Sequence, residues 1–310
     1  MYSWSTLLNE FQAAAASANN PEAGFKHLID KKSQFLRDLS ALTSRNTIVY
    51  FSSWLHKKHE NANINDNDMN AFMECVHKLD QSKGLDLILH TPGGDLAATE
   101  QLINYLKSVF NGDVRAIIPQ MAMSAGSMIA VSCKSIVMGK QSCLGPFDPQ
   151  LNGVPCQSVI REFQRAVEDI EKSPASLGLW QTIISKLNPT FLELCLQANQ
   201  LSNELTDLIL ADKGLDENAK AKIKQVFVNN SDSKTHSRHI CRDKCKEAGL
   251  NIENLEDSQQ IQDLVLGIHH CCMILGENTT IIKSVENNIG GGFVCHATPT
   301  QINRQQLPHP

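Results

Sequence analysis

The chain has 310 residues, of which 42% are hydrophobic and 20% are charged, and its formal net charge is −5. This composition is typical of a globular protein with a substantial core, in one large domain or one domain with helical extensions. The mild acidity and the lack of a dense Lys/Arg run argue against a nucleic-acid partner. No apolar stretch reaches the roughly 20 residues that cross a bilayer, and the N-terminus lacks a signal-peptide pattern. The sequence therefore predicts a cytoplasmic protein with no integral membrane segment.

Ten cysteines are spread through the chain. In so long a sequence they favour reduced core residues over a disulfide framework. Two local pairs, Cys241 with Cys245 and Cys271 with Cys272, are the candidates for metal ligands. Because no CxxC pair repeats, the sequence predicts no metal site, and a zinc-dependent function is the last alternative. No cofactor is expected either.

The first 44 residues carry helix-compatible apolar spacing, with "NNPEAG" at 19–24 as a turn and helix start. They predict a helical N-terminal arm. From 46 to about 150, short β-branched runs alternate with amphipathic segments, which predicts parallel strands joined by helices. The runs are "NTIVYF", "LDLILH", "VRAIIP" and "SIVMG". From about 156 onward nearly the whole pattern is helical, with breaks, and "VNNSDSKTHS" at 228–237 is the best linker candidate.

Two motifs in the alternating region carry the functional signal. "DLILHTPGGD" places a Pro-Gly-Gly turn directly after a predicted strand, without the lysine of a phosphate-binding loop. Thirty residues beyond Gly94, after one helix and one strand, "QMAMSAGSMIA" places Ser124 between small residues at the start of an apolar helix. Both segments resemble the Clp protease proteolytic subunit and signal peptide peptidase A. With "KSIVMGKQSCLGPFDPQ", the match extends over about 65 residues and looks most like the serine dehydrogenase proteinase family.

This resemblance implies an α/β fold with a Clp/crotonase-like core of stacked βαβ turns. The expected organisation is a helical arm at 1–44, a catalytic core at 45–215, and a helical C-terminal extension and tail at 216–310. It also implies a serine peptidase, or a related serine hydrolase, acting on a peptide or protein substrate.

The chemistry of acyl transfer explains the residue types at the two motifs. A serine hydroxyl needs a base, and the carbonyl oxygen that it attacks becomes an oxyanion that needs preorganised donors. Ser124 at a helix N-terminus is the predicted nucleophile. The amide of Ala125 lies in the first helical turn and has no intrahelical acceptor. Gly94 allows a second amide to approach closely. The alternative is a tight strand-to-helix turn without catalysis.

The general base is less well defined by the sequence. The Clp subunit uses a histidine about 25 residues after its serine, and Asp148 stands in that region here. The signal-peptide-peptidase relatives use a lysine 40 to 50 residues beyond the serine, where Lys172 lies 48 residues on. Another register places Arg165 there, and arginine is no base because its pKa lies above about 12. Asp148 and Lys172 are therefore candidates for a base or an orienting group, with a turn cap and an exposed helix end as their structural alternatives.

Five of the eleven histidines are weighed for a place in the site. His90 directly precedes the Thr-Pro-Gly-Gly turn, and strand alternation favours packing against a covering helix over a place in the site. The others, His236, His239, His269 and His270, fall in the C-terminal part, where a structural or solvated role is favoured.

Two further functions share the predicted fold. A crotonase-type acyl-CoA enzyme would keep the oxyanion hole but would need a CoA pocket, and a non-catalytic assembly or binding protein would lack a base. A homo-oligomer is also expected, because the arm and the segment 263–275 carry apolar residues on more than one face.

Overall fold

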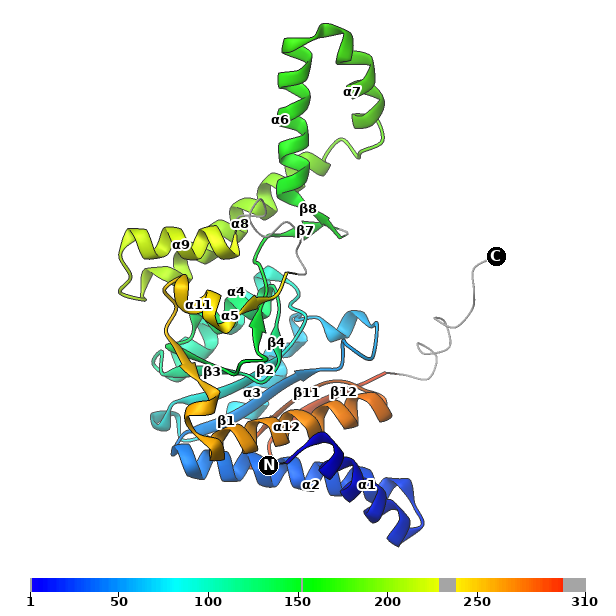
Figure 1. Cartoon of the computed structure of the whole chain (residues 1–310), viewed down its shortest axis with the longest axis vertical. Coiled ribbons are helices and arrows are strands. Elements are labelled where there is room, and N and C mark those ends of the chain that lie inside the picture. The colour runs from blue at the N-terminus through cyan, green and yellow to red at the C-terminus, as the bar shows by residue number, and fades with distance from the viewer. Residues whose placement is uncertain (1, 152, 229–237, 298–310) are drawn as a thin grey trace. The chain divides into compact units, whose positions relative to one another are not determined.

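The computed structural model describes residues 2–151, 153–228 and 238–297. They form two compact units, one of Met1–Leu144 with Ile240–Pro310 and the other of Gly145–His239 (Figure 1). The predicted linker at 228–237 lies, apart from Val228, outside the described residues. The division into arm, core and extension stays a prediction.

A seven-stranded sheet forms the centre of the first unit, in the order β10-β5-β3-β2-β1-β11-β12. Neighbours from β10 to β1 pair in parallel, whereas β11 is antiparallel to β1, and β12 to β11. The strands are β1 (Asn46–Ser52), β2 (Leu85–His90), β3 (Val114–Ile118), β5 (Ser135–Met138), β10 (Ile252–Asn254), β11 (Ile281–Asn287) and β12 (Gly292–His296). This mostly parallel sheet, with helices packed around it, confirms the α/β class that the alternating pattern predicted.

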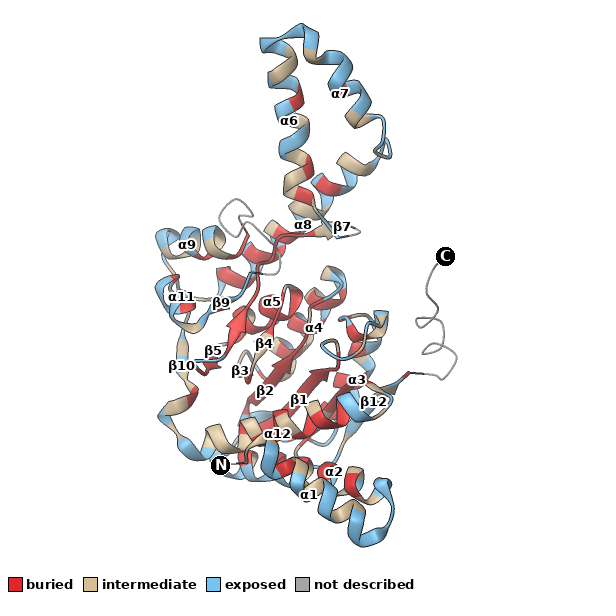
Figure 2. Ribbon diagram, turned by 45° about the vertical axis from the view of Figure 1, so that its right-hand side comes forward, coloured by how far each residue is buried: buried red, intermediate tan, exposed pale blue. Residues whose placement is uncertain are grey.

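Helices cover both faces of this sheet (Figure 2), and every residue of β1 and β2 is buried. Strands buried on both faces read as continuous apolar runs, which explains "TIVYF" and "LILH". One face carries α1 (Trp4–Ala18), α2 (Pro21–Thr43) and α12 (Gln259–Asn278). The other face carries α3 (Asn67–Val76), α4 (Leu96–Val109) and α5 (Ala125–Ser132). Among the described helices, none combines the length and hydropathy needed to span a bilayer.

The N-terminal helices are part of the main core. Leu7 of α1, Phe35 of α2 and Ile268 of α12 belong to one buried cluster that also contains Phe51 and Ile88 of the sheet. The apolar faces expected to meet another subunit therefore cover each other and the sheet within one chain. The homo-oligomer expected from these segments stays a prediction.

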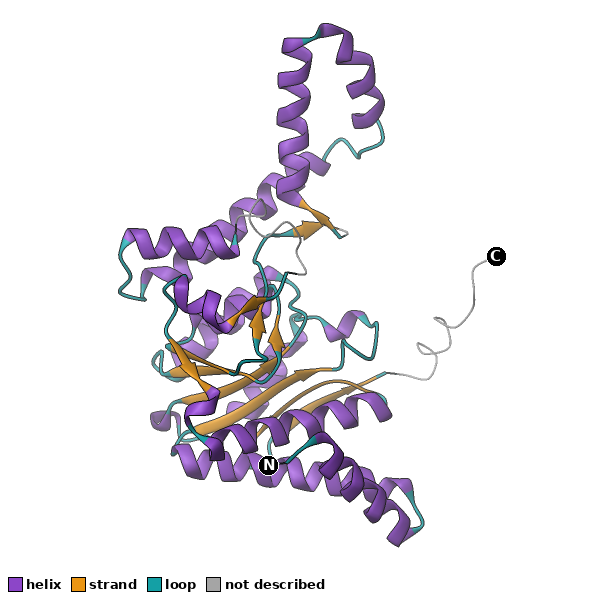
Figure 3. Ribbon diagram, in the orientation of Figure 1, coloured by secondary structure: helices purple, strands orange, loops and turns teal. Residues whose placement is uncertain are grey.

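The C-terminal part is not purely helical, in contrast to the sequence prediction. Figure 3 shows strands β11 and β12 beside β1, directly after α12. The segment "TTIIKSVEN" is rich in β-branched residues, which suit a strand buried in a sheet. β11 therefore extends the sheet on the side where β1 would otherwise be an edge strand.

The second unit is mainly helical. It begins with a hairpin of β7 (Gln150–Leu151) and β8 (Val154–Pro155), followed by α6 (Cys156–Lys172), α7 (Leu177–Ile184), α8 (Phe191–Ala211) and α9 (Glu217–Phe227). Cys156, Val159 and Cys195 form the centre of a small core between α6 and α8. The helical pattern predicted beyond residue 156 is confirmed over this unit.

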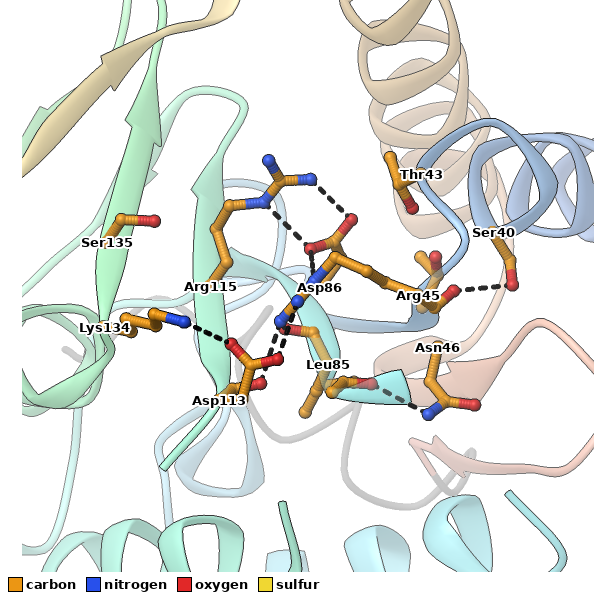
Figure 4. A network of polar contacts seen from close by, with 12 residues as sticks. Ser40, Thr43, Arg45, Asn46, Leu85, Asp86, Asp113, Arg115, Lys134 and Ser135 are labelled. Atoms are coloured by element: carbon orange, nitrogen blue, oxygen red, sulfur yellow. Dashed lines mark hydrogen bonds and ion pairs between the residues drawn. The ribbon is translucent and has the colours of Figure 1, made fainter. Parts of the chain in front are cut away.

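A buried carboxylate joins the first three strands at their N-terminal ends (Figure 4). Asp86 of β2 is fully buried and accepts hydrogen bonds from Arg45 and Arg115. The Arg45 guanidinium also binds Asp113, 2.9 Å away. Because Arg45 precedes β1 and Arg115 lies in β3, one carboxylate holds three neighbouring chain segments together.

Candidate active site

Ser124 occupies a strained turn between a strand and a helix. It follows β4 (Met121–Ala122) and directly precedes α5, with φ 50° and ψ −121°. Asn19 and Ser44 also have positive φ, but their ψ values of 37° and 26° place them in the ordinary left-handed region. The Ser124 conformation is far from this region and costs about 1–3 kcal/mol. Backbone strain of this kind is found mainly at functional sites. Its side chain is partly exposed and makes no helix-capping bond within the described chain.

Backbone bonds bring the Pro-Gly-Gly turn against Ser124. Thr91, directly after β2, forms a parallel bridge with Ala122. The Thr91 amide donates to the Met121 carbonyl (3.3 Å), and the Met123 amide donates to the Thr91 carbonyl (2.9 Å). The two motifs that the sequence separates by thirty residues thus lie side by side.

Gly93 is the glycine that touches the serine, and the sequence reasoning missed it. A Cβ at Gly93 would lie 2.8 Å from the Ser124 Cβ and 2.9 Å from the Ala125 nitrogen. Its φ of +97° also favours glycine. The doubled glycine was the available signal, but the sequence does not tell which of the two meets the serine.

Gly94 lies against a different chain segment. It bridges Ile64, whose amide donates to the Gly93 carbonyl (2.8 Å) and whose carbonyl accepts from the Asp95 amide (3.0 Å). A Cβ at Gly94 would come within 2.3 Å of the Ile64 oxygen, so only glycine permits this approach. Neither the Gly94 amide nor the Ala125 amide has an acceptor among the described residues.

The two buried histidines, His90 and His269, pack against each other. The His90 ring stacks on Phe51 at 5.2 Å and meets His269 of α12 edge-on at 4.9 Å. This contact lies on the face opposite α5 and confirms that His90 packs against a covering helix. Burial lowers the pKa of His90 to about 3 and that of His269 well below its usual value, so both rings are neutral at pH 7.

Two histidines of the C-terminal part have structural or solvated positions. His270 of α12 lies with its Nδ1 3.1 Å from the Tyr2 carbonyl, and His239 is exposed. His236 lies outside the described residues.

The neutral histidines predict a specific loss of stability in acid. In the unfolded chain His90 binds a proton near pH 6.5, whereas in the folded protein it does so only near pH 3. The contribution of neutral His90 to the free energy of unfolding is therefore fully present above pH 6.5 and is lost as the pH falls below that value. For each such histidine the free energy of unfolding falls by about 1.4 kcal/mol per pH unit, which amounts to roughly 3 kcal/mol per histidine between pH 6.5 and pH 4.5. His90→Phe keeps the stacked ring and should remove this share. Urea unfolding at pH 7 and 4.5 measures it, with exposed His77→Gln as the control. Equal acid losses in wild type and His90→Phe would contradict the prediction.

The two candidate bases belong to the second unit, Gly145–His239, and not to the unit that carries Ser124. Asp148 is buried, 1% exposed. Lys172 ends α6 with an exposed side chain, 3.8 Å from Glu168. Arg165 on the same helix lies 3.5 Å from Asp169. Burial is the usual means of activating a lysine base, and Lys172 lacks it.

None of the ten cysteines forms a disulfide, and eight of them are buried, as core residues are. Cys241 is exposed and Cys295 is half-buried. Within the described part of the chain, no three His, Cys, Asp or Glu side chains are grouped so that they could bind one metal ion.

Comparison with known proteins adds two relatives from Methanocaldococcus jannaschii. The uncharacterized protein MJ0137 is 29% identical over 242 residues, which cover 75% of this chain and 77% of that protein. The uncharacterized protein MJ1495 is 30% identical over 185 residues, which cover 60% of this chain and 57% of that protein. A family model described as ClpP-like SDH-type serine proteinase matches residues 26–270, which include both motifs, the whole of the second unit and most of the first. The resemblance read from the sequence is confirmed, and the chain belongs to the ClpP-like SDH-type serine proteinase family.

Proposed function

We propose that the protein is a serine peptidase, or a related serine hydrolase, in which Ser124 attacks the carbonyl of a peptide or protein substrate. One observation carries the proposal: a strained, partly exposed serine lies against a glycine turn beside two amides that have no acceptor. Family membership supports a serine peptidase. The finer assignment rests on the geometry around Ser124.

In this proposal the Ala125 and Gly94 amides donate hydrogen bonds to the oxyanion. The Ala125 amide opens α5, where the helix dipole also favours negative charge. Gly94 is held by Ile64 through bonds that leave its own amide available. Each donor of this kind contributes about 2.7–4 kcal/mol to the stability of the transition state. The strain at Ser124 then serves to present its oxygen beside these donors.

Asp148 and Lys172 remain the proposed partners of Ser124 for proton transfer. Asp148 is the better supported of the two, because it is buried and a carboxylate in such a place can orient or accept a proton. Lys172 would need to leave its exposed pairing with Glu168 before it served as a base.

We also propose that the protein forms a homo-oligomer. The helices of the second unit expose large apolar side chains, which supports association. They include Val167, Leu177, Leu179, Leu194, Leu196 and Leu208.

Labelling with a fluorophosphonate probe tests the nucleophile, because the probe reacts with an activated serine. We expect wild type to be phosphonylated and Ser124→Ala to be unreactive. Ser127→Ala is the matched control: Ser127 lies on the same helix, is buried, and donates to the Ala122 carbonyl at 2.6 Å. Fragmentation of the labelled peptide should place the adduct on Ser124. Equal labelling of wild type and Ser124→Ala would remove Ser124 from the mechanism, and an unlabelled wild type would favour the non-catalytic alternative.

A further inference from the structure

A buried ion pair lies on the α3 face of the sheet, in the unit that carries Ser124. The Lys283 Nζ lies 2.7 Å from Oδ1 and 2.9 Å from Oδ2 of Asp68. Their side chains are only 5% and 4% exposed. Desolvation of two charges cancels much of their attraction, so such a pair is a poor source of stability.

Both members of the pair form hydrogen bonds with one short loop, residues 63–65. The Lys283 ammonium donates to the Asn63 carbonyl (2.7 Å), and the Asp68 carboxylate accepts from the Asn65 amide (3.0 Å). Ile64 is the residue between these two contacts. Its backbone is thus fixed from both sides by charged groups that are themselves buried.

Ile64 transmits this position to the glycine turn. Its amide and carbonyl bind the Gly93 carbonyl and the Asp95 amide, so it spans Gly94 on both sides. A Cβ at Gly94 would collide with three backbone atoms of Ile64. Backbone packed this closely leaves little freedom, so a shift of Ile64 must move the Gly94 amide.

A second connection runs through Tyr50. Its hydroxyl donates to the Asp68 Oδ2 (2.9 Å) and also interacts with the Thr91 side chain. The Thr91 hydroxyl in turn accepts a bond from the Gly93 amide (3.2 Å). Burial and the Asp68 charge raise the pKa of Tyr50 well above its usual value, so the hydroxyl keeps the proton that it donates.

We propose that Lys283 and Asp68 are positioning residues for the oxyanion site, holding the Gly94 amide in place through the loop Asn63–Ile64–Asn65. The proposal rests on the proposed function, in which Gly94 is an oxyanion donor. Neither residue contacts Ser124 in this scheme, because both act through the backbone of Ile64.

The kinetic test uses Lys283→Met and Asp68→Asn, with Lys32→Met as the matched control. Lys32 is also a buried lysine, 2.5 Å from Glu286, and Glu286 belongs to β11, as Lys283 does. In the pair variants the maximal rate of Ser124 phosphonylation should fall at least about tenfold, because small misplacements of catalytic groups are costly. The probe concentration that gives half this rate should stay close to that of wild type. Lys32→Met should lose comparable stability while keeping the wild-type rate.

A spectroscopic test follows the turn directly and needs no activity. The sequence contains a single Pro-Gly step, Pro92–Gly93, so proline labelled with ¹³C at its carbonyl and glycine labelled with ¹⁵N single out the Gly93 amide signal. This signal should shift in Lys283→Met and Asp68→Asn and stay in place in Lys32→Met. If wild type is not phosphonylated, the proposed function fails. The Gly93 signal then still shows whether the Lys283–Asp68 pair determines the conformation of the glycine turn.

The double variant Lys283→Met/Asp68→Asn contains no unpaired buried charge and replaces any single variant that does not fold. It should show the same reduced rate and the same shifted signal. An unchanged Gly93 signal, an unchanged maximal rate in a protein whose wild type is labelled, or equal effects in Lys32→Met would each overturn the inference.

Discussion

Gly93→Ala should slow the phosphonylation of Ser124 at least about a hundredfold, the usual consequence of moving a nucleophile or losing an oxyanion donor. The added methyl group would lie 2.7 Å from the Met123 oxygen, 2.8 Å from the Ser124 Cβ and 2.9 Å from the Ala125 nitrogen. None of these atoms is the free end of a flexible side chain. The turn and the start of α5 must therefore separate, and with them the two proposed donors. The second-order rate constant with a fluorophosphonate measures the loss.

Gly112→Ala is the control for the cost of the backbone conformation alone. Gly112 has φ +74°, near the +97° of Gly93, but a Cβ there would meet nothing within 4 Å. Both variants should lose about 1–2 kcal/mol from forcing a left-handed conformation on alanine. Only Gly93→Ala should also lose reactivity. If the two variants retain the same rate constant, the contact between the glycine turn and Ser124 has no part in the chemistry.

The strand-helix alternation around the two motifs was readable from the sequence because its signals are local. β1, β2, β3 and β5 are short apolar runs, and a helix follows each of the first three before the next strand of the large sheet. The same locality explains the success with His90, whose parity along β2 matches that of Ile88, a residue of the core beneath α2 and α12. Pattern and position along one strand were sufficient there.

Contacts between distant segments were not readable in this way. Lys283 and Asp68 are 215 positions apart, and neither stands in a motif that marks it as buried. A lysine in the strand pattern "IIKSVEN" is more often solvated, and only its burial beside Tyr50 reveals another role. The strained φ of Ser124 is equally hidden, because serine has no intrinsic preference for it and the surrounding contacts impose it.

The error at β11 has a different origin. Its β-branched residues were a local signal, but the segment follows a helix of 20 residues and was included in the helical pattern predicted for the whole C-terminal part. The consequence reaches the site, since β11 supplies Lys283. Because the predicted sheet lacked β11, the sequence also did not predict that Lys283 supports the glycine turn.

The contacts of Asp86 predict a large loss of stability when its charge is removed. Arg115 binds both of its oxygens, at 2.9 Å and 2.8 Å, and Arg45 binds Oδ1 at 2.8 Å (Figure 4). The carboxylate is fully buried, and both arginine side chains are only 20% exposed. Removing the charge leaves two largely desolvated guanidinium groups facing each other. Water cannot enter freely to replace the lost interaction.

Asp86→Asn should therefore lower the free energy of unfolding by about 3–5 kcal/mol, the usual cost of breaking a buried ion pair. Asp113→Asn is the matched control, because Asp113 binds the same Arg45 but is 36% exposed, and its loss should cost about 1 kcal/mol or less. Urea unfolding in a Trp180→Phe background measures both, since Trp4 and Trp54 then report only the unit that contains the network. A similar loss in the two variants would mean that burial of Asp86 adds nothing to its pairing.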